Sequence, residues 1–238
     1  YKRLQRQGFD RHDVHRLAAR DRHVFAALML AHGHGEGLIT GATRKSAHVM
    51  QRINMVFDAS AEAGAVGVTA LLHKGRIVLV GDTLVHEWPD EQDLATIAER
   101  SADVARHLGL EPRVAFVSFS TFGYPRSERA EKMHKAPSVL EARGADFEYE
   151  GEMTVDVALN AQAQKSYPFS RLTGPANILV VPARHSASIS TKLMQEMAGA
   201  TVIGPILAGI DESIQICSTV STVNDILNMA VLAACKVG

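Results

Sequence analysis

Apolar residues along this chain follow two spacings, one typical of helices and the other typical of strands. From Asp13 to Ala31 they recur at every third or fourth position, which predicts a helix that ends at His32 and Gly33. The same periodicity predicts further helices over residues 41–57, 90–108, 127–143, 186–198 and 223–235. Short apolar runs predict strands over residues 37–40, 65–72, 76–81, 113–119, 147–151, 177–181 and 201–203. This alternation favours an α/β fold with a mainly parallel sheet.

Two of the predicted strand regions carry more specific signals. The runs over 65–72 and 76–81 are joined by His73-Lys74-Gly75, which favours a β-hairpin. The run from Arg113 to Phe119 is almost continuously apolar, as is typical of a parallel strand that helices cover on both faces.

Composition and charge exclude several classes of protein. A length of 238 residues suffices for one large α/β domain or two smaller ones. The net charge of −1 provides no basic surface for nucleic acid or for an anionic membrane. The two cysteines, Cys217 and Cys235, form no disulfide framework, which fits a reducing cytosol.

No apolar run reaches the roughly 18–20 residues of a membrane span, and no signal-peptide pattern occurs. We therefore expect a cytoplasmic protein without a membrane or nucleic-acid partner, and the non-Met start at Tyr1 indicates part of a longer polypeptide.

The loop that follows the predicted strand 113–119 offers the clearest candidate chemistry. In α/β folds, ligands bind beyond the carboxyl ends of the strands, where loops lead to helix N-termini. This loop carries the hydroxyls of Ser118, Ser120 and Thr121, followed by Gly123. Such groups suit a phosphate or an acyl group, but they are also common in turns whose hydroxyls only satisfy the backbone.

Three other patterns favour structural interpretations. The glycines at 33, 35 and 37 follow a helix, whereas a dinucleotide-binding loop follows a strand, so they are interpreted as a helix stop. No closed set of metal ligands accompanies the histidines at 12, 15, 32 and 34, and no metal site is predicted. Glu148, Glu150 and Glu152 alternate along a strand, which more often marks a solvated face than an acid–base pair.

Several segments, taken together in collinear order, resemble the phosphotransacetylase (phosphate acetyl/butyryl transferase) family. Within that family they resemble the C-terminal region of bacterial NADP-dependent (hybrid) malic enzymes. The segments are RVAFVSFSTFG (113–123), FEYEGEMTVDVALN (147–160), YPFSRLTGPAN (167–177), VIGPI (202–206) and DILNM (225–229). RDRHVFAALM (20–29) and GDTLVHE (81–87) also resemble the malic-enzyme branch.

The resemblance implies a fold of two αβα subdomains with mainly parallel sheets and a cleft between them, as in isocitrate and isopropylmalate dehydrogenases. Residues 1–58 and 205–238 would form the first, split subdomain, and residues 59–204 the second, with a further segment of the family domain preceding Tyr1. The cleft would be lined by the loop 118–123 and by residues 174–177, 182–188 and 217–225, which include Asn177.

The family transfers an acetyl group between CoA and phosphate, partly through a Ser-Arg pair that an Asp follows. The resemblance puts Ser218 on the serine and Asp225 on the aspartate, but Thr219 occupies the arginine position. A hydroxyl cannot replace a bidentate cationic clamp on phosphate, and loss of one transition-state donor typically costs about 10²–10³ in rate. Asp225 either keeps a ligand role or caps the last helix.

Three functions follow as hypotheses. The favoured one is a non-catalytic module that binds acetyl-CoA (or CoA), regulates a covalently attached malic-enzyme domain and holds a homo-oligomer together. NADP and Mg or Mn would bind only to that malic-enzyme domain. The second is an active phosphate acetyltransferase in which Arg126, Arg171 or Arg184 replaces the lost cation. The third is a purely structural dimerisation unit, with an apolar helix face formed by Ile226, Leu227, Met229, Val231 and Leu232, which would fit an intrachain core equally well.

Overall fold

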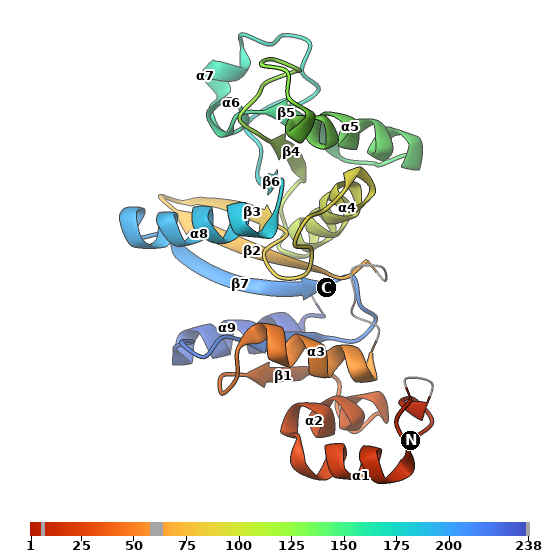
Figure 1. The fold of residues 1–238 in the computed structure, drawn as a ribbon. Coiled ribbons are helices and arrows are strands. Elements are labelled where there is room, and N and C mark those ends of the chain that lie inside the picture. The colour runs from red at the N-terminus through yellow and green to blue at the C-terminus, as the bar shows by residue number, and fades with distance from the viewer. Residues whose placement is uncertain (6–7, 58–63, 237–238) are drawn as a thin grey trace. The chain divides into compact units, whose positions relative to one another are not determined.

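The computed structural model describes residues 1–5, 8–57 and 64–236 (Figure 1). The chain divides into two compact units. Unit 1 comprises Tyr1–Ala65 and Gly209–Gly238, and unit 2 comprises Val66–Ala208. The predicted subdomain boundary after residue 58 lies outside the described residues. The boundary predicted after residue 204 falls inside a strand of unit 2 that continues to Ala208.

Unit 1 is built around two short parallel strands. Its elements are α1 (Arg11–Arg20), α2 (Arg22–Ala31), β1 (Leu38–Gly41), α3 (Ser46–Val56), β8 (Ile214–Cys217) and α9 (Val223–Ala234). β1 and β8 pair in parallel, with Leu38 opposite Ile214 and Gly41 opposite Cys217. The two strands therefore end at the same edge.

Two helix predictions in unit 1 are corrected by the structure. The predicted helix over 13–31 is two helices, because Asp21 is extended and its carboxylate accepts hydrogen bonds from two amides in the first turn of α2. The following helix begins at Ser46 rather than at residue 41. Gly41, at φ 109°, completes β1, and Ala42, at φ 60°, adopts a left-handed conformation that a helix cannot include.

Unit 2 contains a six-stranded sheet in the order β5-β4-β6-β3-β2-β7. Its strands are β2 (Val66–His73), β3 (Arg76–Gly81), β4 (Arg113–Val117), β5 (Glu148–Met153), β6 (Ile178–Val180) and β7 (Thr201–Ala208). β2 and β3 form the predicted antiparallel hairpin, and β7 pairs antiparallel with β2. The pairs of β3 with β6, β6 with β4, and β4 with β5 are parallel. Together with β1 and β8, this confirms the predicted α/β fold with mainly parallel sheets.

Helices cover both faces of this sheet. They are α4 (Glu91–His107), α5 (Glu128–Arg143), α6 (Val155–Leu159), α7 (Ala161–Gln164) and α8 (Arg184–Ala198). Val80 packs in one cluster with Ala187 of α8 and Val157 of α6, on the face where Figure 1 shows α8 beside β2 and β3. Its neighbour Gly81 faces the other way, where an added Cβ would lie 2.8 Å from Ile97 of α4. Since β4 is buried from residue 114 to 117, the expectation of a strand covered on both faces is confirmed.

Candidate functional site

The carboxyl ends of the parallel strands in unit 2 share one edge of the sheet. β3, β6 and β4 end at Gly81, Val180 and Val117, and α4, α8 and α5 begin in the segments that follow. Two pockets lie along this edge. One adjoins the loop between β4 and α5, and the other adjoins the loop after β3 and the first turn of α8. This edge is where an α/β fold places its ligands.

A buried carboxylate organises the loop that follows β4. Glu152 is 1% exposed, and its Oε1 accepts hydrogen bonds from the Ser120 hydroxyl at 2.9 Å and from the Gly123 amide at 2.8 Å. Its Oε2 lies 2.8 Å from Nδ1 of His134, on α5. The carboxylate therefore holds the loop to the helix, and the Ser120 hydroxyl is directed at a protein partner rather than at a ligand.

The other two predicted hydroxyl residues of the loop also lie in this turn. The Thr121 hydroxyl accepts from the Thr154 amide at 3.1 Å. Ser118 is half-buried, and its backbone amide donates to the Met153 carbonyl at 2.9 Å. Ser118, Ser120, Thr121 and Gly123 are thus brought together, and for Ser120 and Thr121 the structure favours the interpretation in which hydroxyls satisfy groups of the chain itself.

The protonation of Glu152 follows from these contacts. Burial alone would raise the pKa of its carboxyl, but the hydrogen bonds from the Gly123 amide, from its own backbone amide and from the His134 and Ser120 side chains hold that pKa below its usual range. The carboxylate is therefore charged at neutral pH, and its hydrogen bonds are of the stronger, charge-assisted kind.

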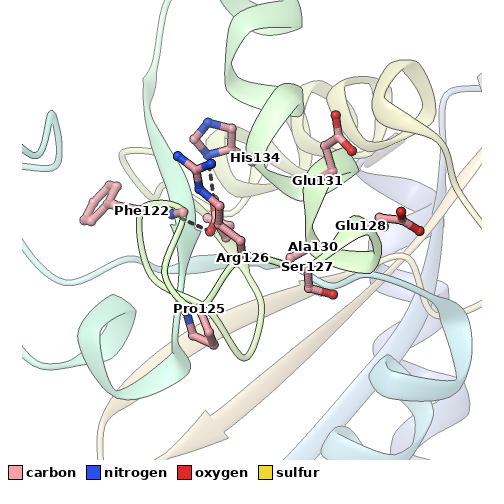
Figure 2. A pocket seen from close by; sticks show the side chains of 10 residues that line it. Phe122, Pro125, Arg126, Ser127, Glu128, Ala130, Glu131 and His134 are labelled. Carbon is pink, nitrogen blue, oxygen red and sulfur yellow. Dashed lines mark hydrogen bonds and ion pairs between the residues drawn. The ribbon is translucent and has the colours of Figure 1, made fainter.

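A pocket of about 740 Å³ lies against this loop (Figure 2). Phe122, Pro125 and Arg126 line it from the loop, and Glu131 and His134 line it from α5. Glu131 forms an ion pair with Lys135 at 2.7 Å. The lining thus combines the guanidinium of Arg126, the imidazole of His134 and three carboxylates, those of Glu128, Glu131 and Glu152, so it is a polar pocket of mixed charge.

One lysine ties the loops of this edge together. Nζ of Lys132 on α5 donates to the Pro89 carbonyl at 2.8 Å and to the Pro182 carbonyl at 3.1 Å. Burial lowers the pKa of this ammonium, against the opposing charges of Asp90 and Asp93. The loop after β3 and the segment before α8 are therefore fixed to the same helix.

Asn177 lies elsewhere in unit 2. Its side chain accepts from the Arg113 amide at 2.8 Å and donates to the Glu111 carbonyl at 2.7 Å, at the amino ends of β4 and β6. β4 separates it from the loop at residues 118–123 by roughly 15 Å, at about 3.3 Å per residue. The structure does not bring Asn177 together with the other predicted residues of unit 2.

Ser218, Thr219 and Asp225 belong to unit 1. Ser218 follows β8, and its hydroxyl accepts from the Val220 amide at 3.2 Å, while Thr219 is exposed. Asp225 forms a capping box with Thr222: its carboxylate accepts from the Thr222 amide at 2.7 Å, and its own amide donates to the Thr222 hydroxyl at 3.2 Å. The capping role predicted for Asp225 is therefore confirmed, and its ligand role stays a prediction.

The sequence prediction missed two residues of unit 1 near the end of β1. Because β1 and β8 are parallel, the exposed Arg44 leaves the same edge as Ser218 and Thr219, and the amide of Ala42 donates to the Cys217 carbonyl at 3.0 Å. His23 is 3% exposed, with Nδ1 2.6 Å from the Thr40 hydroxyl. Burial lowers the pKa of His23; the Asp21 carboxylate opposes this shift, and the neighbouring positive charges add to it, Arg22 most and Arg44 least. Only the strand pairing, which sequence periodicity does not give, reveals this neighbourhood.

The alternating glutamates are not a solvated strand face, and that prediction is wrong. Glu150 and Glu152 are 7% and 1% exposed. Glu150 accepts from the Arg171 amide at 2.9 Å, and Glu148 accepts from the Thr173 amide at 2.9 Å. Each carboxylate satisfies backbone amides of a loop distant in sequence, a structural use that neither sequence interpretation included.

The three arginines considered as replacement cations all lie in unit 2. Arg126 lines the larger pocket. Arg171 lies 3.5 Å from Glu150, with its guanidinium 4.7 Å from the Tyr149 ring centre. Arg184 lies in the first turn of α8 and lines the second pocket.

The glycines after the first predicted helix and the histidines considered as metal ligands can also be compared with the structure. The glycines at 33, 35 and 37 follow α2, which ends at Ala31, so the helix-stop interpretation is confirmed. Within residues 1–5, 8–57 and 64–236, no three His, Cys, Asp or Glu side chains are grouped as metal ligands would be.

Comparison with protein families identifies the chain. The family described as phosphate acetyl/butaryl transferase matches residues 1–234. The chain belongs to this family. It is 48% identical over 238 residues to the NADP-dependent malic enzyme of Rhizobium meliloti, covering all of this chain and 31% of that protein. It is 28% identical over 234 residues to the phosphate acetyltransferase of Bacillus subtilis, covering 98% of this chain and 72% of that protein.

Solved structures agree with this assignment. A phosphotransacetylase from Streptococcus pyogenes matches with a TM-score of 0.84 and 26% identity, over 92% of this chain and 68% of that one. The EutD phosphotransacetylase from Staphylococcus aureus matches with a TM-score of 0.78 and 25% identity, over 91% of this chain and 67% of that one. The predicted resemblance to phosphotransacetylases and to the corresponding part of bacterial malic enzymes is confirmed. The chain spans about a third of the length of the malic enzymes that it matches.

No helix within the described part of the chain has the length and apolar character needed to cross a bilayer.

Proposed function

We propose that this chain is the acetyl-CoA-binding, regulatory and oligomerisation module of a cytoplasmic NADP-dependent malic enzyme. The observation that carries the proposal is the similarity of nearly the whole chain to about a third of the malic enzymes of Rhizobium meliloti and Rickettsia prowazekii, at 48% and 37% identity. The resemblance to the family motif adds Thr219 at the position where an arginine is expected. Oxidative decarboxylation of malate, with NADP and Mg or Mn, would belong to residues outside these 238.

The chemistry at the end of β8 supports binding without turnover. Acetyl transfer to phosphate needs a base to form the CoA thiolate and a cation to hold the phosphate. Asp225 is engaged in the capping box of α9, and Thr219 supplies no positive charge. Arg44 leaves the same strand edge and offers charge for an anionic ligand, but the family motif places its arginine directly after the serine.

A regulatory role requires coupling between this module and the attached enzyme. If acetyl-CoA changes the affinity of that enzyme for its substrate, the substrate changes the affinity for acetyl-CoA by the same factor. Couplings of this kind are typically worth about 1–3 kcal/mol, or about 5- to 150-fold in affinity.

Two exposed apolar helix faces support oligomerisation. On α8, Ile189, Leu193 and Met197 are 64%, 58% and 80% exposed, and they lie four residues apart on one face. On α9, Leu227 and Val231 are 59% and 55% exposed, whereas Met229 and Leu232 of the same helix are buried in the chain. Exposed apolar side chains on one helix face are a feature that protein interfaces share.

Calorimetric titration of the full chain with acetyl-CoA tests the binding part of the proposal. We expect one saturable site, and the absence of both heat and a thermal shift at millimolar ligand would argue strongly against it. A thioester assay with acetyl phosphate and CoA tests the other part of the proposal, the absence of acetyl transfer. In this assay Thr219→Arg restores the cation, and Thr219→Ser serves as the matched control. Turnover of the unaltered chain above about 1 s⁻¹, an ordinary enzyme rate, would instead establish an active phosphate acetyltransferase.

A further inference from the structure

Trp88 is the single tryptophan of the chain and is 70% exposed. It lies in the loop between β3 and α4, with its ring centre 5.0 Å from that of His185 and the two planes inclined at 54°. Both residues line the second pocket of the carboxyl edge, which measures about 550 Å³. An indole of this exposure leaves a large flat apolar surface in water, which is the kind of surface on which a planar ring stacks.

The same pocket contains a positive charge suited to phosphate. The Arg184 guanidinium donates to the Leu84 carbonyl at 3.2 Å and lies 3.3 Å from the exposed Glu87 carboxylate. A guanidinium has five N–H donors, so several remain beyond these two contacts. Arg184 is the first residue of α8, whose N-cap Ala183 has no capping side chain, and the dipole of the 15-residue helix favours an anion there.

The loop that carries Trp88 is held in place by hydrogen bonds to the Asp82 carboxylate and to Lys132. The carboxylate of Asp82, 2% exposed, accepts from the amides of Gly67, Leu84 and His86 at 2.9, 2.7 and 2.7 Å. The carbonyl of Pro89, next to Trp88, is bound by Lys132. Because the loop is already ordered, a ligand would lose little binding energy in fixing it.

We propose that this pocket binds the adenosine-phosphate end of acetyl-CoA. The purine would stack on Trp88 and His185, and a phosphate would bind Arg184 and the first turn of α8. The inference rests on the proposed function, since it assigns this end of acetyl-CoA to unit 2. Glu87 now holds the guanidinium, and the phosphate competes with it.

The position of the indole allows a direct test. In the full chain, all tryptophan fluorescence comes from Trp88, so titration with adenosine 3′,5′-bisphosphate is expected to quench it saturably, and acetyl-CoA is expected to compete. Acetyl-pantetheine, which lacks the nucleotide, is expected to leave the fluorescence unchanged.

Variants followed by calorimetry separate the contributions. Trp88→Ala is expected to weaken adenosine bisphosphate about 5- to 150-fold, the range of base–aromatic stacking, and Arg184→Gln to weaken it about tenfold. Glu87→Gln is expected to tighten binding a few-fold, because it removes the competing carboxylate. Arg106→Gln is the matched control: its side chain has an exposure of 40% against 37% for Arg184 and an ion pair with Asp146, and we expect no change in affinity.

The outcomes distinguish this inference from the proposed function. If acetyl-CoA binds the unaltered chain and Trp88→Ala equally, and adenosine bisphosphate does not bind, the assignment of the pocket is overturned while the proposed function stands. If neither compound binds the unaltered chain, both are overturned. Binding of both compounds that depends on Trp88 and Arg184 but not on Arg106 supports the inference.

Discussion

Replacing Glu152 tests whether a buried carboxylate holds the candidate loop in place. Glu152→Ala removes the acceptor of the Ser120 hydroxyl and of the Gly123 amide, and the partner of His134. A buried donor without a partner costs about 1–3 kcal/mol. Ser120 is buried, whereas Gly123 is half-buried and water can reach it more easily, so we expect a loss of about 2–4 kcal/mol in the free energy of unfolding.

Glu152→Gln isolates the charge, because it keeps the shape and one acceptor oxygen. We expect a smaller loss of about 1–2 kcal/mol at pH 7, the difference between charge-assisted and neutral hydrogen bonds, reduced by the desolvation that the charge no longer costs. The pKa of Glu152 is lowered in the folded chain, so its charge stabilises the fold above the unfolded pKa of about 4.3. That stabilisation is lost as the pH falls through the folded pKa. The loss caused by Glu152→Gln is therefore expected to be smaller at pH 4 than at pH 7.

The assay is equilibrium urea unfolding followed by circular dichroism at both pH values. Glu141→Gln is the matched control, since its side chain is 71% exposed and lies 3.8 Å from Arg171, and we expect a change below about 0.5 kcal/mol. The reasoning is refuted if Glu152→Ala and Glu141→Gln differ by less than about 0.5 kcal/mol, or if the effect of Glu152→Gln grows as the pH falls.

Three further predictions concern other parts of the chain. Gly81→Ala is expected to lower the free energy of unfolding by about 1–3 kcal/mol, because the added Cβ would lie 2.7 Å from the Ser101 hydroxyl. Gly174→Ala, where the atom nearest to the added Cβ is 3.9 Å away, is the control and is expected to cost little. Urea unfolding compares the two variants. Asp225→Ala is expected to lower the thermal midpoint of unfolding through loss of about 1 kcal/mol from the capping box, and an unchanged midpoint would contradict that role. Leu193→Glu is expected to shift the sedimentation of the full chain to a smaller species, because it places a charge on the exposed face of α8, and unaltered sedimentation would exclude that face from an interface.

The sequence predicted those features that depend on local pattern. The continuous apolar run of β4 marked a strand covered on both faces, and the signals on either side of His73-Lys74-Gly75 marked the hairpin. β8 (Ile214–Cys217) was missed because the polar Gln215, which is fully buried in the structure, interrupts its apolar run. The break at Asp21 was missed because the apolar spacing continues across it. In the structure the extended Asp21 ends α1, and its carboxylate caps the start of α2.

The candidate site was less predictable, because its contacts join residues that are distant in sequence. The loop at 118–123 follows a parallel strand, as predicted, and a pocket adjoins it, while its binding role stays a prediction. Its central partner, Glu152, lies 32 residues beyond Ser120, and alternation alone suggested a solvated face. Trp88 carried no motif, and only its exposure beside His185 and Arg184 shows it as a candidate contact.

The central claim is that the chain binds acetyl-CoA without transferring its acetyl group. Titration of the full chain with acetyl-CoA in phosphate buffer, followed by chromatography of the recovered nucleotide, tests both halves of that claim in one sample. The account predicts saturable binding and recovery of intact acetyl-CoA. Free CoA formed in proportion to the amount of protein, or no saturable binding at all, would contradict it.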